Sequence, residues 1–111
     1  MITGPRLEAE AGLMANHHPH FQLFITDREV GFSGWLRGPQ SGQWYATMGK
    51  AKIADYPQQE PAVYMKPQIG GHWWVGGRLC WHPDGGHWKP GQNTFAKAIY
   101  VAIEYLARFD R

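Results

Sequence analysis

The chain has 111 residues, a formal net charge of +2 at pH 7 and 43% hydrophobic residues. This length suits a single domain with one modest core, and the hydrophobic content is too high for a disordered chain. The lysines and arginines are scattered along the sequence apart from Lys50 and Lys52, a distribution that does not indicate a nucleic-acid partner. We therefore expect one domain over residues 1–111.

The location of the protein follows from what the sequence lacks. The sequence contains no run of 18 apolar residues, so it predicts no transmembrane helix. Residues 1–14 do not have the continuous apolar core of a signal peptide. The single cysteine cannot form an internal disulfide, which favours a reducing compartment. We expect a cytoplasmic protein without a membrane partner.

The first two thirds of the sequence predict a helix followed by four strands. Pro5 suits the first turn of a helix over residues 5–14, and the segment before Pro19 ends it. Alternating apolar residues, separated by turn sequences and closed by Pro67, then predict an antiparallel meander. Its strands are His20–Thr26, Val30–Arg37, Gln43–Ala54 and Ala62–Lys66.

The last third predicts a long loop and a helix. No regular element is predicted over the 26 residues between Pro67 and Asn93, and loops of that length in compact domains are usually functional or disordered. Asn93 or Thr94 then caps a helix with one apolar face, at Phe95, Ile99, Ala102, Ile103 and Leu106. The predicted class is α+β, with the helices packed on one face or end of the sheet.

Most of the side chains that could take part in catalysis or binding lie in residues 70–90. This glycine-rich stretch holds the only cysteine, Cys80, four of the six tryptophans and three of the six histidines. The tryptophan density argues against disorder, and loops carry function more often than core segments do. We interpret Cys80 as a nucleophile, against the alternative of a buried, inert cysteine.

Five local motifs resemble segments of the ubiquitin-conjugating enzyme (UBC) fold, in the family's order and over nearly the whole chain. They are Arg6-Leu7-Glu8 with Leu13, Gly38-Pro39 with Gly42 and Trp44-Tyr45, Tyr56-Pro57 with Pro61-Ala62-Val63, Gly77-Arg78-Leu79-Cys80, and Trp88-Lys89-Pro90. The resemblance implies a truncated UBC-like fold with a long active-site loop before the C-terminal helix.

Two departures from the family pattern point to one subset of the family. The His-Pro-Asn triplet that precedes the family's cysteine is absent, and His72 lies about where its asparagine falls. The family's acceptor-positioning acid would lie beyond Arg111. In both respects the chain resembles bacterial stand-alone conjugating-like proteins of antiphage operons, including those encoded beside a cGAS-like nucleotidyltransferase in cyclic-oligonucleotide signalling (CBASS).

The resemblance implies a cofactor-free acyl transferase. Cys80 would accept a C-terminal glycyl group as a thioester and pass it to an amine. The donor would be a protein with an extended C-terminal tail, either the nucleotidyltransferase or a ubiquitin-like protein, with a separate activating enzyme. Two alternatives stay open: a non-catalytic module that binds such a partner, and a cysteine hydrolase that combines Cys80 with a histidine and Asp84.

Polar residues around Cys80 are candidates for supporting roles. His72, His82 and His87 titrate near neutrality and are candidates to lower the thiol pKa or to act as general base. His72 is also a candidate oxyanion donor, against the alternative of a structural histidine. Asp84 would orient a histidine or replace the missing acid, although Pro-Asp-Gly-Gly also predicts a simple turn.

Aromatic residues of the same stretch are candidates to bind a peptide tail. Trp73, Trp74, Trp81 and His87 would line a groove, or the tryptophans would form a small core beneath the loop. Trp88 we assign to the core. One cysteine with three histidines could bind zinc, but the sequence has no zinc-site spacing, so we expect no metal. We expect His17, His18 and His20 to be exposed loop residues.

Overall fold

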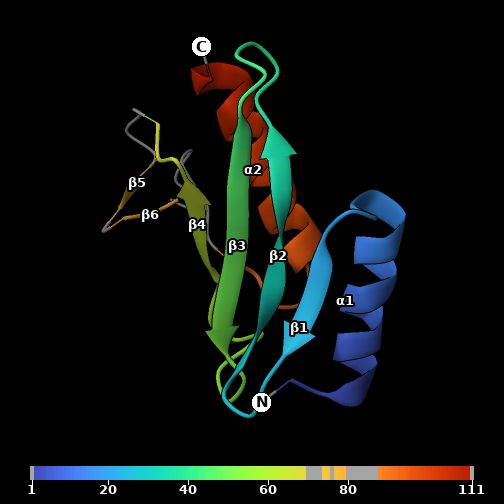
Figure 1. Cartoon of the computed structure of the whole chain (residues 1–111). Helices are drawn as coiled ribbons and strands as arrows, with labels where there is room; N and C mark the ends of the chain where they lie inside the picture. Colours follow the sequence, from blue (N-terminus) through green and yellow to red (C-terminus); the bar gives the residue numbers. More distant parts are fainter. Residues whose placement is uncertain (1, 70–73, 76, 80–87, 111) are drawn as a thin grey trace.

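The computed structural model of the protein describes residues 2–69, 74–75, 77–79 and 88–110, which form an α+β fold (Figure 1). Helix α1 spans Gly4–His17 and helix α2 spans Phe95–Phe109. Six described strands form one antiparallel sheet in the order β1-β2-β3-β4-β6-β5. Their bounds are β1 Gln22–Ile25, β2 Glu29–Arg37, β3 Trp44–Lys52, β4 Ala62–Lys66, β5 Trp74–Val75 and β6 Arg78–Leu79. The predicted order of helix, four-stranded meander and helix is confirmed.

Helix α1 begins within one residue of its predicted start but ends later than predicted. The Thr3 side chain accepts a hydrogen bond from the Arg6 amide at 3.2 Å, and Pro5 lies in the first turn. The helix continues to His17, three residues beyond the predicted end. The reason is that Pro19 disfavours helical geometry only at the residue directly before it, and that residue is the helix cap, His18.

Strands β2 and β3 form the longest pairing in the sheet, without a break in register from Glu29 opposite Lys52 to Arg37 opposite Trp44. Gly49 lies opposite Phe32, and the Phe32 ring occupies the space that a side chain at Gly49 would need. A glycine inside a strand indicates either a bulge or a close approach, and at Gly49 the structure shows the close approach.

The prediction of no regular element between Pro67 and Asn93 was wrong. Strands β5 and β6 pair with each other, Trp74 with Leu79 and Val75 with Arg78, and Leu79 also pairs with Val63 of β4. Gly77 has a φ of +82°, a left-handed conformation that glycine adopts without steric cost. In the sequence, the Gly76-Gly77 dipeptide between Trp74-Val75 and Arg78-Leu79 is typical of a two-residue hairpin turn, and this was the indication of the two strands.

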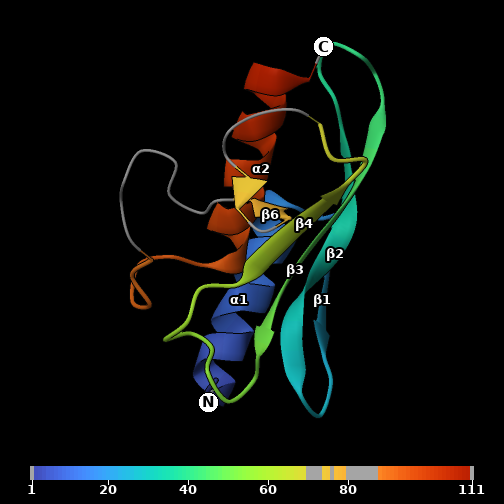
Figure 2. The same ribbon diagram turned by 90° about the vertical axis from the view of Figure 1, so that its left-hand side faces the viewer.

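Both helices lie on the same side of the sheet (Figure 2), and the core fills the space between these layers. Helix α2 buries the apolar face that its periodicity predicts, except that Ile103 stays 38% exposed. The strands contribute buried residues from alternate positions, among them Val30, Phe32, Tyr45 and Val63. No helix within the described ranges has the length and apolar character needed to cross a membrane.

Alternation sends the other apolar strand residues to the opposite face. Trp35 of β2 is 61% exposed, and Trp44 of β3 is 54% exposed, while their neighbours Leu36 and Tyr45 face the core. A run of adjacent apolar residues therefore divides between two faces, which the sequence alone did not resolve.

Candidate functional site

Most of the predicted site lies outside the described residues. This applies to Cys80, His72, His82, Asp84, Trp73, Trp81 and His87. The structure places the backbone of Trp74 in β5. The described segments on either side of the cysteine show how the fold holds the two flanks of this stretch.

The N-terminal flank is strand β6, which leads directly into Cys80 in the sequence. Leu79, the residue before the cysteine, is only 5% exposed and belongs to the core. Its pairing with Val63 attaches β6 to β4, so this short strand continues the main sheet. Arg78 is exposed, as expected for the next position along a strand. The chain therefore reaches the cysteine from a buried, hydrogen-bonded position.

The C-terminal flank begins at Trp88, whose indole Nε1 donates a hydrogen bond to the Pro57 carbonyl oxygen at 2.6 Å. The Trp88 and Tyr56 rings lie 5.9 Å apart between centroids. Trp88 is partly buried and packs against the core, which confirms its predicted placement there. Two segments separated by about thirty residues thus meet at this tryptophan.

A compact turn joins Trp88 to helix α2. The amides of Gln92 and Asn93 donate to the Lys89 carbonyl at 2.9 and 2.8 Å, and the Asn93 side chain accepts from the Lys89 amide at 2.7 Å. Thr94 is the helix cap, with its side chain accepting from the Lys97 amide at 3.2 Å. The two residues that the sequence offered as alternative caps therefore have different roles, since Asn93 stabilises the turn and Thr94 begins the helix.

A buried carboxylate binds this turn to helix α1. Glu10 is fully buried, and its Oε1 accepts from the Phe95 amide at 3.0 Å. Its Oε2 accepts from the Arg6 Nε at 3.2 Å and from the Tyr56 hydroxyl. Arg6 also donates to the carbonyl oxygens of Asn93, at 2.6 Å, and Pro90. We call Arg6, Glu10 and Tyr56 the anchor cluster.

The charges of the anchor cluster balance. Burial raises the pKa of the Tyr56 hydroxyl, and the neighbouring Glu10 carboxylate raises it further, so the phenol keeps its proton and remains a donor. The Arg6 cation faces the Glu10 carboxylate, and each has further hydrogen bonds, which a buried ion pair requires. The cluster is thus a satisfied, neutral network that holds the C-terminal flank.

Sequence reasoning missed the anchor cluster. From its position in the first half of the helix, Glu10 would be one of the acids that favour a helix N-terminus, whereas the structure buries it. The indication was helical spacing: Arg6, Glu10 and Met14 recur every four residues, so they share the face on which Met14 enters the core. An acid and a base on an apolar face indicate a buried pair.

The sequence predicts His17, His18 and His20 as exposed loop residues. This is wrong for His18, which is buried, and for His17, which is exposed but belongs to helix α1. His18 is 7% exposed, and its Nε2 donates to the Ala96 carbonyl at 3.0 Å. Burial lowers the pKa of this imidazole. His17 remains exposed and its Nδ1 lies 3.0 Å from the Tyr100 hydroxyl. Among the described residues, no group of three histidine, cysteine or acidic side chains is arranged to hold a metal ion.

No protein-family model, curated protein or solved structure matches the chain.

Proposed function

We propose that the chain is a ubiquitin-conjugating-enzyme-like acyl carrier of the cytoplasm, in which Cys80 takes a protein's C-terminal glycyl group as a thioester and passes it to an amine. One observation carries the proposal: four of the five resembling motifs meet in space, the first of them through Arg6, which donates to the Tyr56 hydroxyl and to the Pro90 carbonyl oxygen. Trp88 donates to Pro57, and Leu79, directly before Cys80, pairs with Val63. Chance similarity of short motifs would not require them to converge.

The anchored flanks suit a group-transfer site. Leu79 is fixed by the sheet, and the Trp88–Asn93 segment is fixed by Pro57 and the anchor cluster. Transfer requires the sulfur to be held in a constant position against an incoming tail, because misplacement by about 1 Å can cost a factor of about 100 in rate. A rigid frame at both ends of the active-site stretch supplies such support.

The proposed reaction has two balanced steps. First, the Cys80 thiolate attacks the glycyl carbonyl carbon of a donor that is already activated as a thioester; a new C–S bond forms and the donor's thiolate leaves. Second, an amine attacks the same carbon; a C–N bond forms, the C–S bond to Cys80 breaks, and the amine proton passes to a base. His82 and His87 are our candidates for that base.

The remaining assignments follow the resemblance. His72 would donate to the oxyanion, and Asp84 would orient a histidine. Trp73, Trp74 and Trp81 would line the groove for the donor tail. The resemblance to antiphage proteins supports a cGAS-like nucleotidyltransferase or a ubiquitin-like protein as donor, with a separate activating enzyme.

Intact mass spectrometry tests the proposal. The tagged chain is expressed in its own host, as wild type and as Cys80→Ser, and measured with and without reductant. Since the chain has one cysteine, any thiol-sensitive adduct must be attached to Cys80. We expect such an adduct on the wild type and a reductant-resistant ester on the serine variant, with the donor identified by its mass.

The absence of an adduct on both forms would contradict the enzyme proposal. If a partner then co-purified equally with wild type and Cys80→Ser, the chain would be a non-catalytic binding module, the alternative that the missing triplet favours. Cys80→Ala serves as the matched control, because it keeps the fold and removes every nucleophile at this position.

A further inference from the structure

The face of the sheet opposite the helices is rich in exposed aromatic side chains. We define the outer face as the strand residues of β1–β4 that alternate with the core residues. Trp35 and Trp44 are 61% and 54% exposed there, and Met48 lies between β2 and β4 with 36% exposure. No described helix covers this side (Figure 2). Two tryptophans this exposed on a sheet with a well-packed inner face indicate a binding surface.

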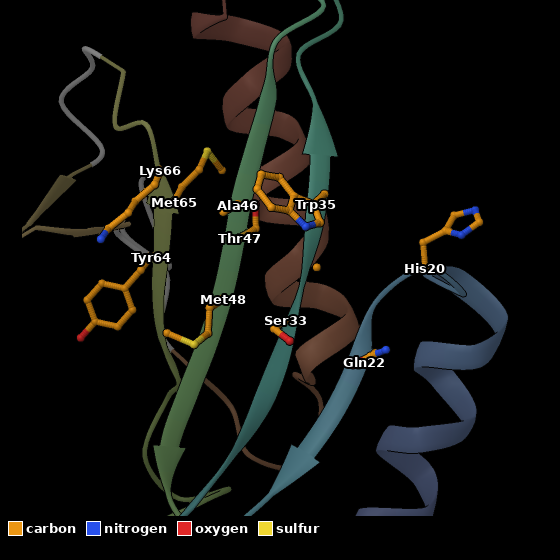
Figure 3. A pocket seen from close by; sticks show the side chains of 11 residues that line it. His20, Gln22, Ser33, Trp35, Ala46, Thr47, Met48, Tyr64, Met65 and Lys66 are labelled. Atoms are coloured by element: carbon orange, nitrogen blue, oxygen red, sulfur yellow. The ribbon is translucent and has the colours of Figure 1, made fainter.

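The outer face is also hollowed. A depression of about 500 Å³ crosses β1–β4, and Trp35, Met48, Lys66 and His20 are among the residues that line it (Figure 3). Its size is that of a site for a small organic group, and it is open to solvent along the sheet. A flat ring fits such a shallow, aromatic-walled depression.

Cations accompany the aromatic residues along the outer face. By the same alternation this face carries Arg37, Lys50, Lys52 and Lys66, and Glu29 is its one acid among the described strand residues. Glu29 lies 3.5 Å from the Lys50 ammonium. Four cations and one acid give the outer face a net charge of +3, against +2 for the whole chain, so its ligand should be anionic.

Register places a cation next to Trp44 and another cation two strands away from Trp35. Trp44 lies opposite Arg37, whose guanidinium carbon is 5.7 Å from the Trp44 ring centroid. Trp35 and Lys66 lie opposite Ala46 from its two sides. The pair Arg37–Trp44 and the row Trp35–Ala46–Lys66 are two residues apart along the strands, which is about 6.8 Å. This spacing is comparable to one nucleotide of an extended single strand.

We propose that the outer face binds single-stranded nucleic acid, with bases stacked on Trp35 and Trp44 and phosphates held by the cations beside them. Sequence-tolerant binders of single strands combine these two elements, a positively charged track and aromatic platforms. An antiparallel sheet with helices behind it is a scaffold that supports this arrangement.

An acidic protein surface is the other anionic partner. The aromatic residues, Met48 and Arg37 are residue types that suit it too, so the choice between the two partners depends on the lysines and small residues of the face. Three of the four cations are lysines, a residue type depleted at protein–protein interfaces. The central positions include Ser33 and Ala46, whose residue types are depleted there as well. Lysine binds phosphate readily as a point charge, so the same composition suits a nucleic-acid backbone.

This proposal departs from the expectation of no nucleic-acid partner, which depended on basic residues being scattered along the sequence. The basic residues are far apart in the sequence, but several of them lie close together in the fold. Arg37, Lys50 and Lys66 come from three strands that hydrogen bonding brings side by side. The proposal is independent of thioester chemistry at Cys80 and is tested without any acyl donor.

Fluorescence anisotropy of the purified chain tests it. The probes are labelled oligothymidylate and oligouridylate of about 15 nucleotides, and a duplex of equal length, at about 50 mM salt. We expect both single strands to bind, with the duplex weaker because its bases are not free to stack. The slope of log affinity against log salt should be about −0.7 per phosphate contact, so roughly −2 to −3 for three or four contacts.

Two kinds of variant separate stacking from charge. Trp35→Ala and Trp44→Ala should each weaken single-strand binding by about 5- to 100-fold. Lys66→Ala should reduce the salt slope by about 0.7. The matched controls on the helical side are Tyr100→Ala for an exposed aromatic residue and Lys97→Ala for a cation, and we expect both to bind as the wild type does.

Three results would overturn the proposal. The first is no binding of either single strand. The second is equal binding of a polyglutamate peptide, which would assign the outer face to an acidic protein. The third is single-strand binding that survives removal of both tryptophans while Lys66→Ala and Lys97→Ala weaken it equally, since that would indicate attraction to the whole chain rather than to this face.

Discussion

The inner and outer faces of the sheet have opposite characters although the same strands build both. The inner face buries Phe32 and Tyr45 completely or almost completely, while Trp35 and Trp44 on the outer face remain more than half exposed. The helical side also has two buried acids, Glu10 of α1 and Asp110 at the end of α2. Both accept several hydrogen bonds from the protein.

This difference separates packing from recognition. Buried polar groups with complete hydrogen bonds contribute to a single, well-ordered arrangement of helices and loops. Exposed aromatic rings contribute little to folding because they stay in water. The free energy of burying them can therefore be gained when a ligand covers them. Substitutions on the inner face should therefore change stability, and substitutions on the outer face should change binding.

The largest expected loss of stability comes from Glu10→Ala. It would leave the Arg6 cation, the Tyr56 hydroxyl and the Phe95 amide without their shared acceptor. Breaking a buried pair in this way typically costs about 3–5 kcal/mol of unfolding free energy. Urea denaturation measures the loss. Glu8→Ala on the exposed side of the same helix is the control, with an expected change within about 0.5 kcal/mol; equal losses would show that Glu10 does not act as an anchor.

The second carboxylate, Asp110, should make stability fall in acid. Hydrogen bonds from the Ser41 hydroxyl and amide, and from Tyr45 and Gln40, hold the folded pKa of Asp110 below its unfolded value near 3.8. The stabilisation is therefore complete above about pH 4 and is lost as the pH falls further.

We expect Asp110→Asn to lower Tm by roughly 10 °C at pH 7, with a smaller difference from wild type at pH 2–3. Thermal melts at both pH values measure this. The exposed Asp27→Asn offers the comparison, with no such convergence. A constant gap between Asp110→Asn and wild type at all pH values would show that the carboxylate charge is not the source of stability.

A smaller loss is expected at Gly49. A Cβ at this position would overlap the Phe32 ring, which is enclosed in the core, so Gly49→Ala should destabilise by about 1–3 kcal/mol. Gly12→Ala is the opposite case: its Cβ meets nothing on the exposed side of α1, and we expect a gain of about 0.4–1 kcal/mol. The two signs should differ in urea denaturation; a neutral Gly49→Ala would mean that the Phe32 ring moves freely.

The smallest effect on stability belongs to the outer face. Trp35→Ala and Trp44→Ala should each change the unfolding free energy by less than about 1 kcal/mol, because the rings are mostly in water already. Phe32→Ala, on the same strand as Trp35, should cost about 3–5 kcal/mol. Losses of similar size at Trp35 and Phe32 would remove the distinction between the two faces.

The order of the elements and several of their bounds could be predicted from local sequence patterns. Strand β4 begins and ends where alternation and Pro67 predict, and Thr94 caps the last helix as one of two predicted residues. These outcomes depend on interactions within a few residues, between a cap and its helix or between a proline and its neighbour. Local chemistry of this kind is present in the sequence itself.

Contacts between distant segments could not be predicted in this way, because they depend on how the whole chain folds. Trp88 with Pro57, and Arg6 with Asn93, are contacts between segments far apart in the chain, and no local pattern specifies them. The face that each strand residue occupies was decided in the same way, because one residue of register exchanges the buried and exposed sets. For that reason, basic residues that are far apart in the sequence lie together on the outer face. The proposed role of Cys80 follows from the sequence motifs and from the flanking segments that the fold brings together.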